Sequence, residues 1–368
     1  MKIAVDASIL EPPCPTGVER AAAGIVGALG GVLTESDKGD EVFVLSRGTL
    51  PTPPPRHPRI HARVLGGPSP QLVWRETHLA PALSDLGVDV LWSPVTAIPL
   101  GTNVPRVATF HEAPWLVRPG MEGFLRERAH ALRLRIAVET AARIVCPSEA
   151  TAAQLRALHP GAAELVRVVP HGIDERFLAP RSDDSNSAAA VRRESLGVPA
   201  RYLLQVGGNR ARKNVPHLLR AFARYRLRGG KCDLVLAGPG PSPDRAPRGV
   251  TALGWIDDAS LLALYDGAQA VVVASESEGF GLPVLEAAAR GAPVVACASG
   301  GVVEAAGDAA LLVPPGDEEA LASALLSVEN DAATAASLAE RGRSRAAGFR
   351  WATAAARLVA VLRESIPD

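Results

Sequence analysis

Residues 270–297 read AVVVASESEGFGLPVLEAAARGAPVVAC. The apolar, β-branched runs at 270–274 and 293–297 predict two buried strands. Between them lie a glycine-bearing turn at 275–282 and a helix that we expect to open at Pro283, because proline suits the first helical position. Two buried strands joined by a short helix form a βαβ unit, which requires a parallel sheet covered on both faces. The free backbone N–H groups of the turn would then face an anion at the start of the helix.

Strand and helix patterns alternate on both sides of this unit, which is typical of a doubly wound α/β fold. In the first half of the chain we expect strands at 2–6, 41–46, 60–65, 88–92, 104–110, 143–146 and 165–169. We expect helices there at 17–29, 71–86, 122–140 and 148–158. In the second half we expect further strands at 202–206, 233–237, 250–254 and 311–313, helices from Val215 and Ala259, and a last helix at 351–364. Sheets of this kind bind ligands at the carboxyl ends of their strands.

The chain of 368 residues exceeds what one hydrophobic core usually supports, so we expect two domains. Residues 179–190 are polar, small and without periodicity. They predict either the linker between the two domains or a mobile loop next to that linker. We place the first Rossmann-like domain at 1–180 and the second at 195–348. The remaining residues, 349–368, contain the last helix.

Basic and acidic residues balance, with 39 Lys and Arg against 39 Asp and Glu, so nothing draws the whole chain to nucleic acid or to an anionic membrane. The amino terminus lacks the apolar core of a signal peptide, because Asp6 interrupts it, and no apolar run is long enough to span a bilayer. We therefore expect a cytoplasmic protein. Its cysteines are too scattered for a zinc ribbon, and we expect them to be reduced: Cys14, Cys146, Cys232 and Cys297.

Two glutamates bracket the glycine turn. Glu278 directly precedes Gly279, Phe280 and Gly281, and Glu286 falls in the first helical turn. A pair of glutamates at this spacing recurs by chance on many helices. With EGFGLP at its start and a βαβ unit around it, the pattern is specific. It resembles the Glu, seven residues, Glu motif of the family 4 retaining glycosyltransferases.

This resemblance covers nearly the whole chain and is densest at 202–313. It implies the GT-B architecture, in which two Rossmann-like domains face each other across an interdomain cleft and the helix at 349–368 packs back on the first domain. It also implies an enzyme that moves a hexose from a nucleotide-diphosphate sugar to an acceptor hydroxyl with retention of configuration. The basic loop looks most like that of mannosyltransferases, so GDP-mannose is the favoured donor, with UDP- or dTDP-hexoses as alternatives. The acceptor would be a small molecule, a glycan or a lipid-linked molecule.

A basic loop follows the first strand of the second domain, in the segment VGGNRARKNVPHLLRAF at 206–222. No carboxylate occurs between Ser195 and Cys232. Arg212 and Lys213 would therefore carry unpaired positive charge, which suits a diphosphate. The RKN triplet before an apolar helix resembles the phosphate-binding lysine segment of the family.

The loop departs from one common pattern of the family at Gly208 and Asn209, where many members carry an arginine after the strand glycine. Arg212 is our candidate for the group that assists Lys213, and Gly208 is a further candidate for donor binding. Along the following helix, a solvated basic face is the simpler interpretation for Arg220, Arg224 and Arg228.

The resemblance implies a role for the other residues of the donor site. Glu278 would face the transferred sugar or the leaving phosphate, and Glu286 would accept hydrogen bonds from both ribose hydroxyls. The turn would bind the donor at Gly279, Phe280, Gly281 and Leu282. The segment LGWIDDA resembles the one that wraps the nucleotide base, so that Trp255 and Ile256 would flank the base. Ordinary packing explains Trp255 equally well.

Two positions of the first domain also match the family. Gly17 stands at a turn directly before a helix, where it resembles the glycine loop after the first strand, although capping alone explains a lone glycine there. His111 ends an apolar strand where the family commonly has His followed by Asp, and Glu112 takes the second place here. A lone histidine at a strand end is usually structural, but in this setting we expect His111 to contact the transferred sugar as a catalytic residue.

Other classes of protein fit less well. A Gly-x-Gly at 238–240 follows a strand, but prolines as far as Pro247 forbid the helix that a dinucleotide site needs. No Asp-x-Asp motif lies beside a strand end, so we expect no metal and no other cofactor. The remaining rivals are a GT-B phosphorylase or epimerase, although no pyridoxal-binding lysine motif is evident, and a sensor that binds a nucleotide sugar without transfer. The basic helix at 124–143 resembles helices that touch membrane in some relatives, but a plain surface helix is simpler, so we expect at most peripheral membrane contact and no nucleic-acid partner.

Overall fold

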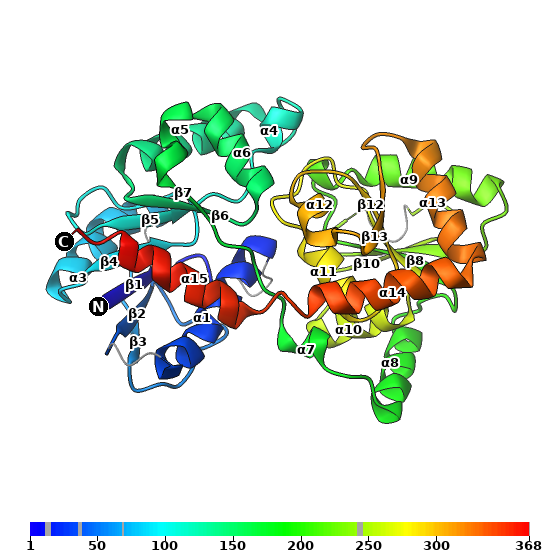
Figure 1. The fold of residues 1–368 in the computed structure, drawn as a ribbon, viewed down its shortest axis with the longest axis horizontal. Helices are drawn as coiled ribbons and strands as arrows, with labels where there is room; N and C mark the ends of the chain where they lie inside the picture. Colours follow the sequence, from blue (N-terminus) through cyan, green and yellow to red (C-terminus); the bar gives the residue numbers. More distant parts are fainter. Residues whose placement is uncertain (12–15, 36–38, 68–69, 241–245, 368) are drawn as a thin grey trace. The chain divides into compact units, whose positions relative to one another are not determined.

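The computed structural model of the chain describes residues 1–11, 16–35, 39–67, 70–240 and 246–367. The chain divides into two compact units (Figure 1). Unit 1 comprises Met1–Glu112, Gly123–Gly172 and Arg350–Asp368, and unit 2 comprises Ala113–Glu122 and Ile173–Phe349. Cys14 lies outside the described residues, and the other cysteines are buried free thiols: Cys146, Cys232 and Cys297.

Unit 1 is built on a seven-stranded parallel sheet in the order β3-β2-β1-β4-β5-β6-β7. Its strands are β1 (Lys2–Asp6), β2 (Glu41–Ser46), β3 (Ile60–Val64), β4 (Val90–Ser93), β5 (Arg106–Thr109), β6 (Arg143–Cys146) and β7 (Val166–Val168). The central strand β1 pairs with β2 and with β4, so that Val5 lies opposite Val44 on one side and Trp92 on the other. All three side chains are buried.

Helices cover both faces of this sheet. They are α1 (Gly17–Glu35), α2 (Gln71–Trp74), the π-helical turn η1 (Arg75–Leu79), α3 (Ala80–Asp85), α5 (Phe124–Thr140), α6 (Glu149–Leu158), the 3₁₀ turn η2 (Pro160–Leu165) and α15 (Trp351–Glu364). Along β1, Ile3 and Val5 belong to the core that includes α1 and α15, whereas Ala4 belongs to the core of α2 and α3. This alternation is the reason why the strand is apolar at each of positions 3–5 rather than at every second one.

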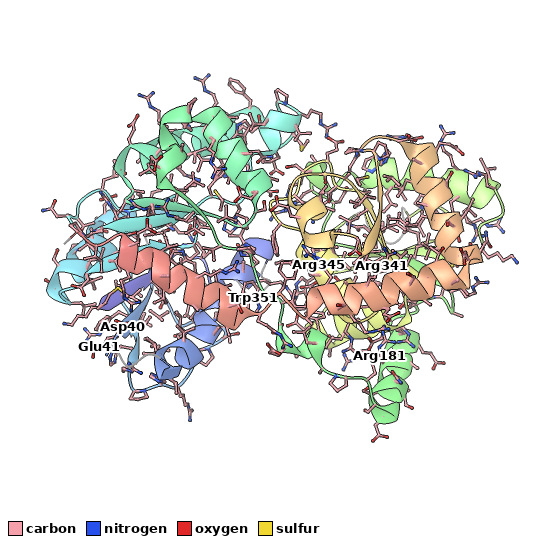
Figure 2. The ribbon with its side chains drawn as sticks, viewed as in Figure 1. Asp40, Glu41, Arg181, Arg341, Arg345 and Trp351 are labelled. Atoms are coloured by element: carbon pink, nitrogen blue, oxygen red, sulfur yellow. The ribbon has the colours of Figure 1, made fainter. Side chains whose placement is uncertain are left out.

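The last helix, α15, packs along α1 within unit 1 (Figures 1 and 2). Two glycines permit the close approach. A Cβ on Gly24 of α1 would lie 2.2 Å from the indole ring of Trp351, and a Cβ on Gly172 would lie 2.2 Å from the backbone nitrogen of Trp351. Larger residues at these two positions would therefore force α15 away.

Unit 2 contains a six-stranded parallel sheet in the order β10-β9-β8-β11-β12-β13. Its strands are β8 (Tyr202–Val206), β9 (Asp233–Ala237), β10 (Val250–Gly254), β11 (Ala270–Val273), β12 (Val294–Cys297) and β13 (Ala310–Val313). Two of them, β11 and β12, are the strands of the predicted βαβ unit, and they pair in register with Val272 opposite Val295. The prediction of an α/β fold with parallel sheets is confirmed.

Helices of unit 2 also lie on both sides of its sheet. The helical elements of the unit are α4 (Pro114–Val117), α7 (Glu175–Leu178), α8 (Asp183–Ser195), the 3₁₀ turn η3 (Ala211–Lys213), α9 (Val215–Leu227), α10 (Asp258–Gly267), α11 (Leu282–Ala289), α12 (Gly301–Ala306), α13 (Glu318–Asn330) and α14 (Ala332–Ala346). Val271 and Val273 of β11 pack in the core formed with α10, α11 and α12. Ala270 and Val272 pack in the core formed with α9 and α13.

The interpretation of residues 179–190 as a linker is wrong. Helix α8 starts within this segment, at a capping box in which the side chains of Ser182 and Ser185 bond each other's backbone N–H. Arg193 anchors the helix on α10 by donating to the carbonyl of Ala263 at 2.9 Å. The sequence indicates a loop here because the segment has no apolar period. The capping box and the Arg193 contact define the helix instead, and neither produces such a period.

Among the described residues, no helix combines the length and the apolar character that crossing a membrane requires.

Candidate active site

At the carboxyl edge of the unit 2 sheet, the backbone segments after β8 and β9 pack closely at glycine residues. A Cβ on Gly208 would lie 2.7 Å from the carbonyl oxygen of Pro239, and a Cβ on Gly238 would lie 2.8 Å from the carbonyl carbon of Gly207. The N–H of Gly238 donates to the carbonyl of Gly254 at 2.7 Å, which ties the ends of β9 and β10 together. Packing therefore accounts for glycine at position 208 without any ligand.

A buried ionic cluster lies at the same edge, where η3 meets the turn after β11. Lys213 donates from Nζ to Oε1 of Glu278 at 2.5 Å, and Arg212 donates from Nη1 to Oε2 at 3.0 Å. Ser275 also donates to Oε1, at 2.6 Å. Only 9% of Lys213 and 7% of Glu278 are exposed, so that the pair is largely shielded from water.

The prediction that Arg212 and Lys213 carry unpaired charge is wrong, since both pair with Glu278. The segment 196–231 contains no carboxylate, but Glu278, which pairs with Lys213, lies 65 residues further along the chain. Two cations and one carboxylate still leave one positive charge in the cluster. That charge would attract an anion.

Burial alone would raise the pKa of the Glu278 carboxyl, but the charges of Lys213 and Arg212 and the hydrogen bonds from Lys213 and Ser275 outweigh it. The net effect holds the pKa of Glu278 well below its ordinary value. Glu278 is therefore an anion at neutral pH and serves only as a hydrogen-bond acceptor.

The turn that follows Glu278 packs against the start of α12. The N–H of Gly301 donates to the carbonyl of Glu278 at 2.8 Å. A Cβ on Gly300 would lie 2.4 Å from the Glu278 oxygen, and a Cβ on Gly301 would lie 2.4 Å from the oxygen of Gly279. None of the predicted site residues lies in this second turn, although Ser299, Gly300 and Gly301 closely follow the predicted strand at 293–297.

Helix α11 begins directly after this turn. Its N-cap residue, Gly281, has φ +106°, a left-handed conformation that side chains disfavour. Leu282 opens the helix and packs against the core, and the side chain of Phe280 is 5% exposed and lies edge-on to Phe349. Phe280 can thus meet a ligand only through its backbone.

Glu286 lies one turn into α11 and is 7% exposed. The buried hydroxyl of Tyr265, from α10, donates to its Oε2 at 2.9 Å. This contact fixes the orientation of the carboxylate. Sequence reasoning missed Tyr265, which looks like an ordinary core position of its helix.

Trp255 and Ile256 follow β10. Trp255 is 51% exposed, so ordinary core packing does not explain it. Ile256 is half-buried and packs against the core on the α10 and α11 side of the sheet. One exposed ring beside one anchored aliphatic side chain is compatible with the predicted contact to a base.

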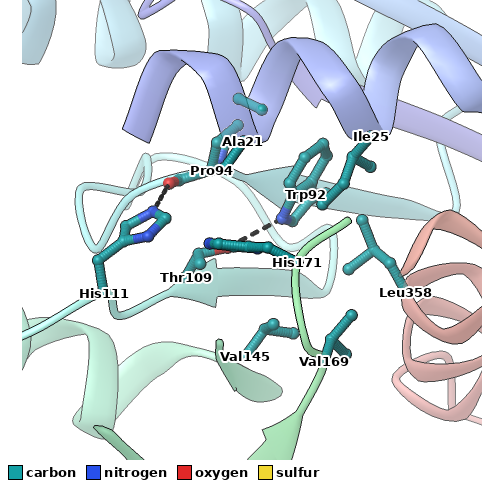
Figure 3. A pocket seen from close by; sticks show the side chains of 11 residues that line it. Ala21, Ile25, Trp92, Pro94, Thr109, His111, Val145, Val169, His171 and Leu358 are labelled. Atoms are coloured by element: carbon teal, nitrogen blue, oxygen red, sulfur yellow. Dashed lines mark hydrogen bonds between the residues drawn. The ribbon is translucent and has the colours of Figure 1, made fainter. Parts of the chain in front are cut away.

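In unit 1, His111 follows β5 and hydrogen bonds through Nε2 to the carbonyl of Pro94 at 2.8 Å (Figure 3). Burial lowers the pKa of His111, and the Pro94 carbonyl and the charge of Glu19 oppose that shift. Since a carbonyl only accepts, the neutral ring carries its proton on Nε2, and Nδ1 is the acceptor.

His111 borders a small pocket that is otherwise mostly apolar. Figure 3 shows its lining: Ala21, Ala22, Ile25, Trp92, Pro94, Thr109, His111, Val145, Val169, His171 and Leu358. Trp92 donates from Nε1 to Thr109 at 3.0 Å, and the rings of His111 and His171 lie 5.7 Å apart. Burial and the neighbouring His111 lower the pKa of His171 to about 3, so that this ring stays neutral.

Gly17 is the first residue of α1 rather than part of a turn before it. The N–H and the hydroxyl of Thr16 both bond the carboxylate of Glu19, which caps the helix. A Cβ on Gly17 would meet nothing within 4 Å. Capping explains the helix start, and a role of Gly17 in anion binding stays a prediction.

The predicted residues thus gather in two places. In unit 2, the turn and the basic loop come together through Lys213, Arg212 and Glu278. In unit 1, the charge of Glu19 acts on His111, so the start of α1 and the end of β5 lie near each other. Among the described residues, no three His, Cys, Asp or Glu side chains are grouped so that they could hold a metal ion.

Two family models match the chain. The one described as Glycosyltransferase Family 4 matches residues 17–177, and the one described as Glycosyl transferases group 1 matches residues 200–331. Glycogen synthase of Mycobacterium tuberculosis is 31% identical over 299 residues, which are 74% of this chain and 69% of that protein. The chain belongs to glycosyltransferase family 4.

This glycosyltransferase is also similar to the MMP alpha-(1->4)-mannosyltransferase of Mycolicibacterium hassiacum, at 33% identity over 55% of this chain and 49% of that protein. Among solved structures, the sucrose-phosphate synthase of Thermosynechococcus elongatus has a TM-score of 0.73 at 22% identity and matches 99% of this chain and 98% of that one. HepE of Anabaena, solved with UDP-glucose, has a TM-score of 0.72 at 18% identity and matches 99% of both chains. The glycosyltransferase has the GT-B fold, as the sequence predicts.

Proposed function

We propose that this glycosyltransferase transfers a hexosyl group from a nucleotide-diphosphate sugar to an acceptor hydroxyl, with retention of anomeric configuration. The observation that carries the proposal is the buried cluster of Lys213, Arg212 and Glu278. It places one net positive charge at the carboxyl edge of a parallel sheet, where such folds bind their ligands. Fixed cations in a water-poor site suit the diphosphate of a donor.

Donor binding would exchange partners within this cluster. The diphosphate takes over the hydrogen bonds of Lys213 and Arg212, which in the free enzyme go to Glu278. Glu278 remains an anion beside Ser275 and then accepts a hydrogen bond from a hydroxyl of the hexose. In the free enzyme, Glu278 therefore holds both cations in place and compensates one of the two buried positive charges.

Transfer breaks the bond between the anomeric carbon and the diphosphate oxygen. The acceptor oxygen forms a bond to the same carbon on the same face, and its proton passes to the leaving diphosphate. Negative charge grows on the diphosphate and positive charge on the sugar ring as this happens. Lys213 and Arg212 stabilise the first and Glu278 the second, and donors that are fixed in advance need no reorganisation.

The remaining candidates would hold the donor. Glu286, oriented by Tyr265, accepts hydrogen bonds from the ribose hydroxyls. The base lies against Trp255 and Ile256. His111 contacts the transferred sugar through Nδ1, which the bond of Nε2 to Pro94 leaves as the acceptor of the neutral ring.

GDP-mannose is the first donor to test, because the basic loop resembles mannosyltransferases and a mannosyltransferase is among the relatives. UDP-glucose is the second, since HepE was solved with it. We further propose that turnover needs no divalent metal, because Lys213 and Arg212 already supply the positive charge that a metal would bring to the diphosphate.

Release of nucleoside diphosphate from labelled nucleotide sugars tests the proposal. We expect release that depends on the enzyme and on one nucleotide sugar, with the label transferred to an acceptor or to water. Tight binding of a nucleotide sugar without any release would instead identify a sensor. Product of inverted configuration would contradict the retaining mechanism alone.

A further inference from the structure

Two buried serine hydroxyls beside the ionic cluster have no hydrogen-bond partner in the part of the chain that the structure describes. They are Oγ of Ser277 and Oγ of Ser299. The two residues are only 2% and 4% exposed. Buried hydroxyl groups almost always find a partner, because an unpaired one forfeits its hydration without compensation.

Both serines border the backbone contact between the two glycine turns. Ser277 directly precedes Glu278, and its carbonyl lies 3.5 Å from Nη1 of Arg212. Ser299 directly precedes Gly300, whose Cβ position is 2.4 Å from the carbonyl oxygen of Glu278. The unpaired hydroxyls therefore belong to residues that lie next to the backbone of Glu278, the residue whose carboxylate we assign to the sugar.

Two other buried serines show that burial alone does not leave a serine hydroxyl without a hydrogen-bond partner. Ser275, 1% exposed, donates to Glu278 at 2.6 Å. Ser365, 6% exposed in unit 1, donates to the carbonyl of Val361 at 2.7 Å. Since the fold satisfies comparable serines elsewhere, the two unpaired ones are explained if their partner is a ligand.

The chemistry of the cluster indicates which part of a donor would fit. Lys213 and Arg212 only donate hydrogen bonds, and the ionised Glu278 only accepts them. A sugar hydroxyl does both, so one that donates to Glu278 still needs a donor for its own oxygen. A serine hydroxyl supplies this donor, whereas phosphate oxygens already have the two cations.

We propose that Ser277 and Ser299 bind hydroxyl groups of the transferred hexose in the donor complex. The proposal rests on the proposed function and extends it, because it assigns two further residues to the sugar. Both serines lie in loops, and rotation about the Cα–Cβ bond can redirect each O–H. Donor binding would then satisfy two groups that the free enzyme leaves unpaired.

The test compares two ligands on three variants: Ser277→Ala, Ser299→Ala and the double variant. We expect each single change to weaken binding of the nucleotide sugar about three- to tenfold, the usual effect of losing one neutral hydrogen bond. Binding of the nucleoside diphosphate alone should stay the same, because the sugar is absent from it. Isothermal titration with GDP-mannose and GDP, and with UDP-glucose and UDP, gives both values.

The melting temperature without ligand provides a second readout. Removing an unpaired buried hydroxyl removes its desolvation penalty, so both variants should melt at or above the wild-type temperature. The matched control is Ser365→Ala, which loses a bond that is made and should lower the melting temperature while binding the donor normally.

Three outcomes would overturn the proposal. Unchanged nucleotide-sugar affinity in the double variant would show that the hydroxyls do not touch the sugar. An equal loss for the sugar and for the nucleoside diphosphate would place them on the phosphate instead. Failure of the wild type to bind any nucleotide sugar would remove the proposed function and this assignment together, which distinguishes it from the first two results.

Discussion

The two sheets of this glycosyltransferase end in edges of different chemistry. The unit 2 edge carries Lys213, Arg212 and Glu278, held as a buried ionic cluster beside two glycine turns. The unit 1 edge carries His111 and His171, both kept neutral by burial, around a small and mostly apolar pocket. Both edges come from the same strand and helix alternation.

The shared fold thus determines where a site lies but not what the site binds. Charge at the unit 2 edge suits a diphosphate, whose charge grows as the glycosidic bond breaks. Neutral hydrogen-bonding groups at the unit 1 edge suit uncharged hydroxyls instead. Substitutions at the two edges should therefore affect different quantities.

The largest effect on activity is expected at the unit 2 edge. Lys213→Ala removes the cation that we assign to the diphosphate, so donor binding and transfer should fall together. A charge-assisted hydrogen bond is worth roughly 1.5–3 kcal/mol, which corresponds to about ten- to a hundredfold in kcat/KM. Steady-state kinetics with the preferred donor measures it.

Arg220→Ala is the matched control. Arg220 also carries positive charge on the α9 side of unit 2, but it pairs with Glu318 on the surface and is 59% exposed in its side chain. A surface pair contributes little, so kcat/KM should stay near the wild-type value. Equal losses from both substitutions would show that the basic site has been misplaced.

A second effect is expected at the unit 1 edge, and it concerns stability rather than catalysis. The pKa of His171 is about 3 in the folded chain, below its ordinary value of about 6.5, so the unfolded chain binds a proton that the folded chain does not. The contribution is therefore complete above about pH 6.5 and is lost as the pH falls toward 3. Each pH unit within this window should lower the free energy of unfolding by up to about 1.4 kcal/mol.

Urea titrations between pH 7 and pH 5 measure this dependence, and His171→Asn should reduce its slope and leave the part that is due to His111. Glu278→Gln should leave the slope unchanged there, because the pKa of Glu278 is lowered from an ordinary value that already lies below this range. The carboxylate loses its contribution only in stronger acid. A slope that responds to Glu278→Gln and not to His171→Asn would reverse the assignment of the two edges.

The smallest expected effect is that of metal removal. If Lys213 and Arg212 supply the positive charge at the diphosphate, as we propose, treatment with a chelator should change turnover by less than about twofold. A large loss that manganese restores would contradict the phosphate site described above.

Much of the fold could be predicted from the sequence because parallel strands that are buried on both faces read as short apolar runs. The strands at Lys2–Asp6, Glu41–Ser46, Tyr202–Val206 and Asp233–Ala237 were predicted to the residue. Helix α8 was missed because a capping box and Arg193 define it rather than an apolar face. Helix α12 was missed because it has only six residues, which are too few for a period.

Part of the candidate site could also be predicted from the sequence, and part could not. The Glu278 motif could be read because all its residues are adjacent in the sequence. The bonds from Lys213 to Glu278 and from Tyr265 to Glu286 could not, because they depend on how strands β8 and β11 pair in the sheet and how helices α10 and α11 pack on it. Gly208 was assigned to the donor, yet the carbonyl of Pro239 explains why it is a glycine.

We propose that Glu278 acts as the glycosidic bond breaks, whereas Glu286 only holds the donor. Kinetics of Glu278→Gln and Glu286→Gln test it most directly, because glutamine keeps the shape of the side chain and removes the charge. We predict that Glu278→Gln lowers kcat with little change in donor KM, and that Glu286→Gln raises donor KM and spares kcat. A wild-type kcat in Glu278→Gln together with a strongly reduced kcat in Glu286→Gln would show that the roles of the two glutamates are reversed.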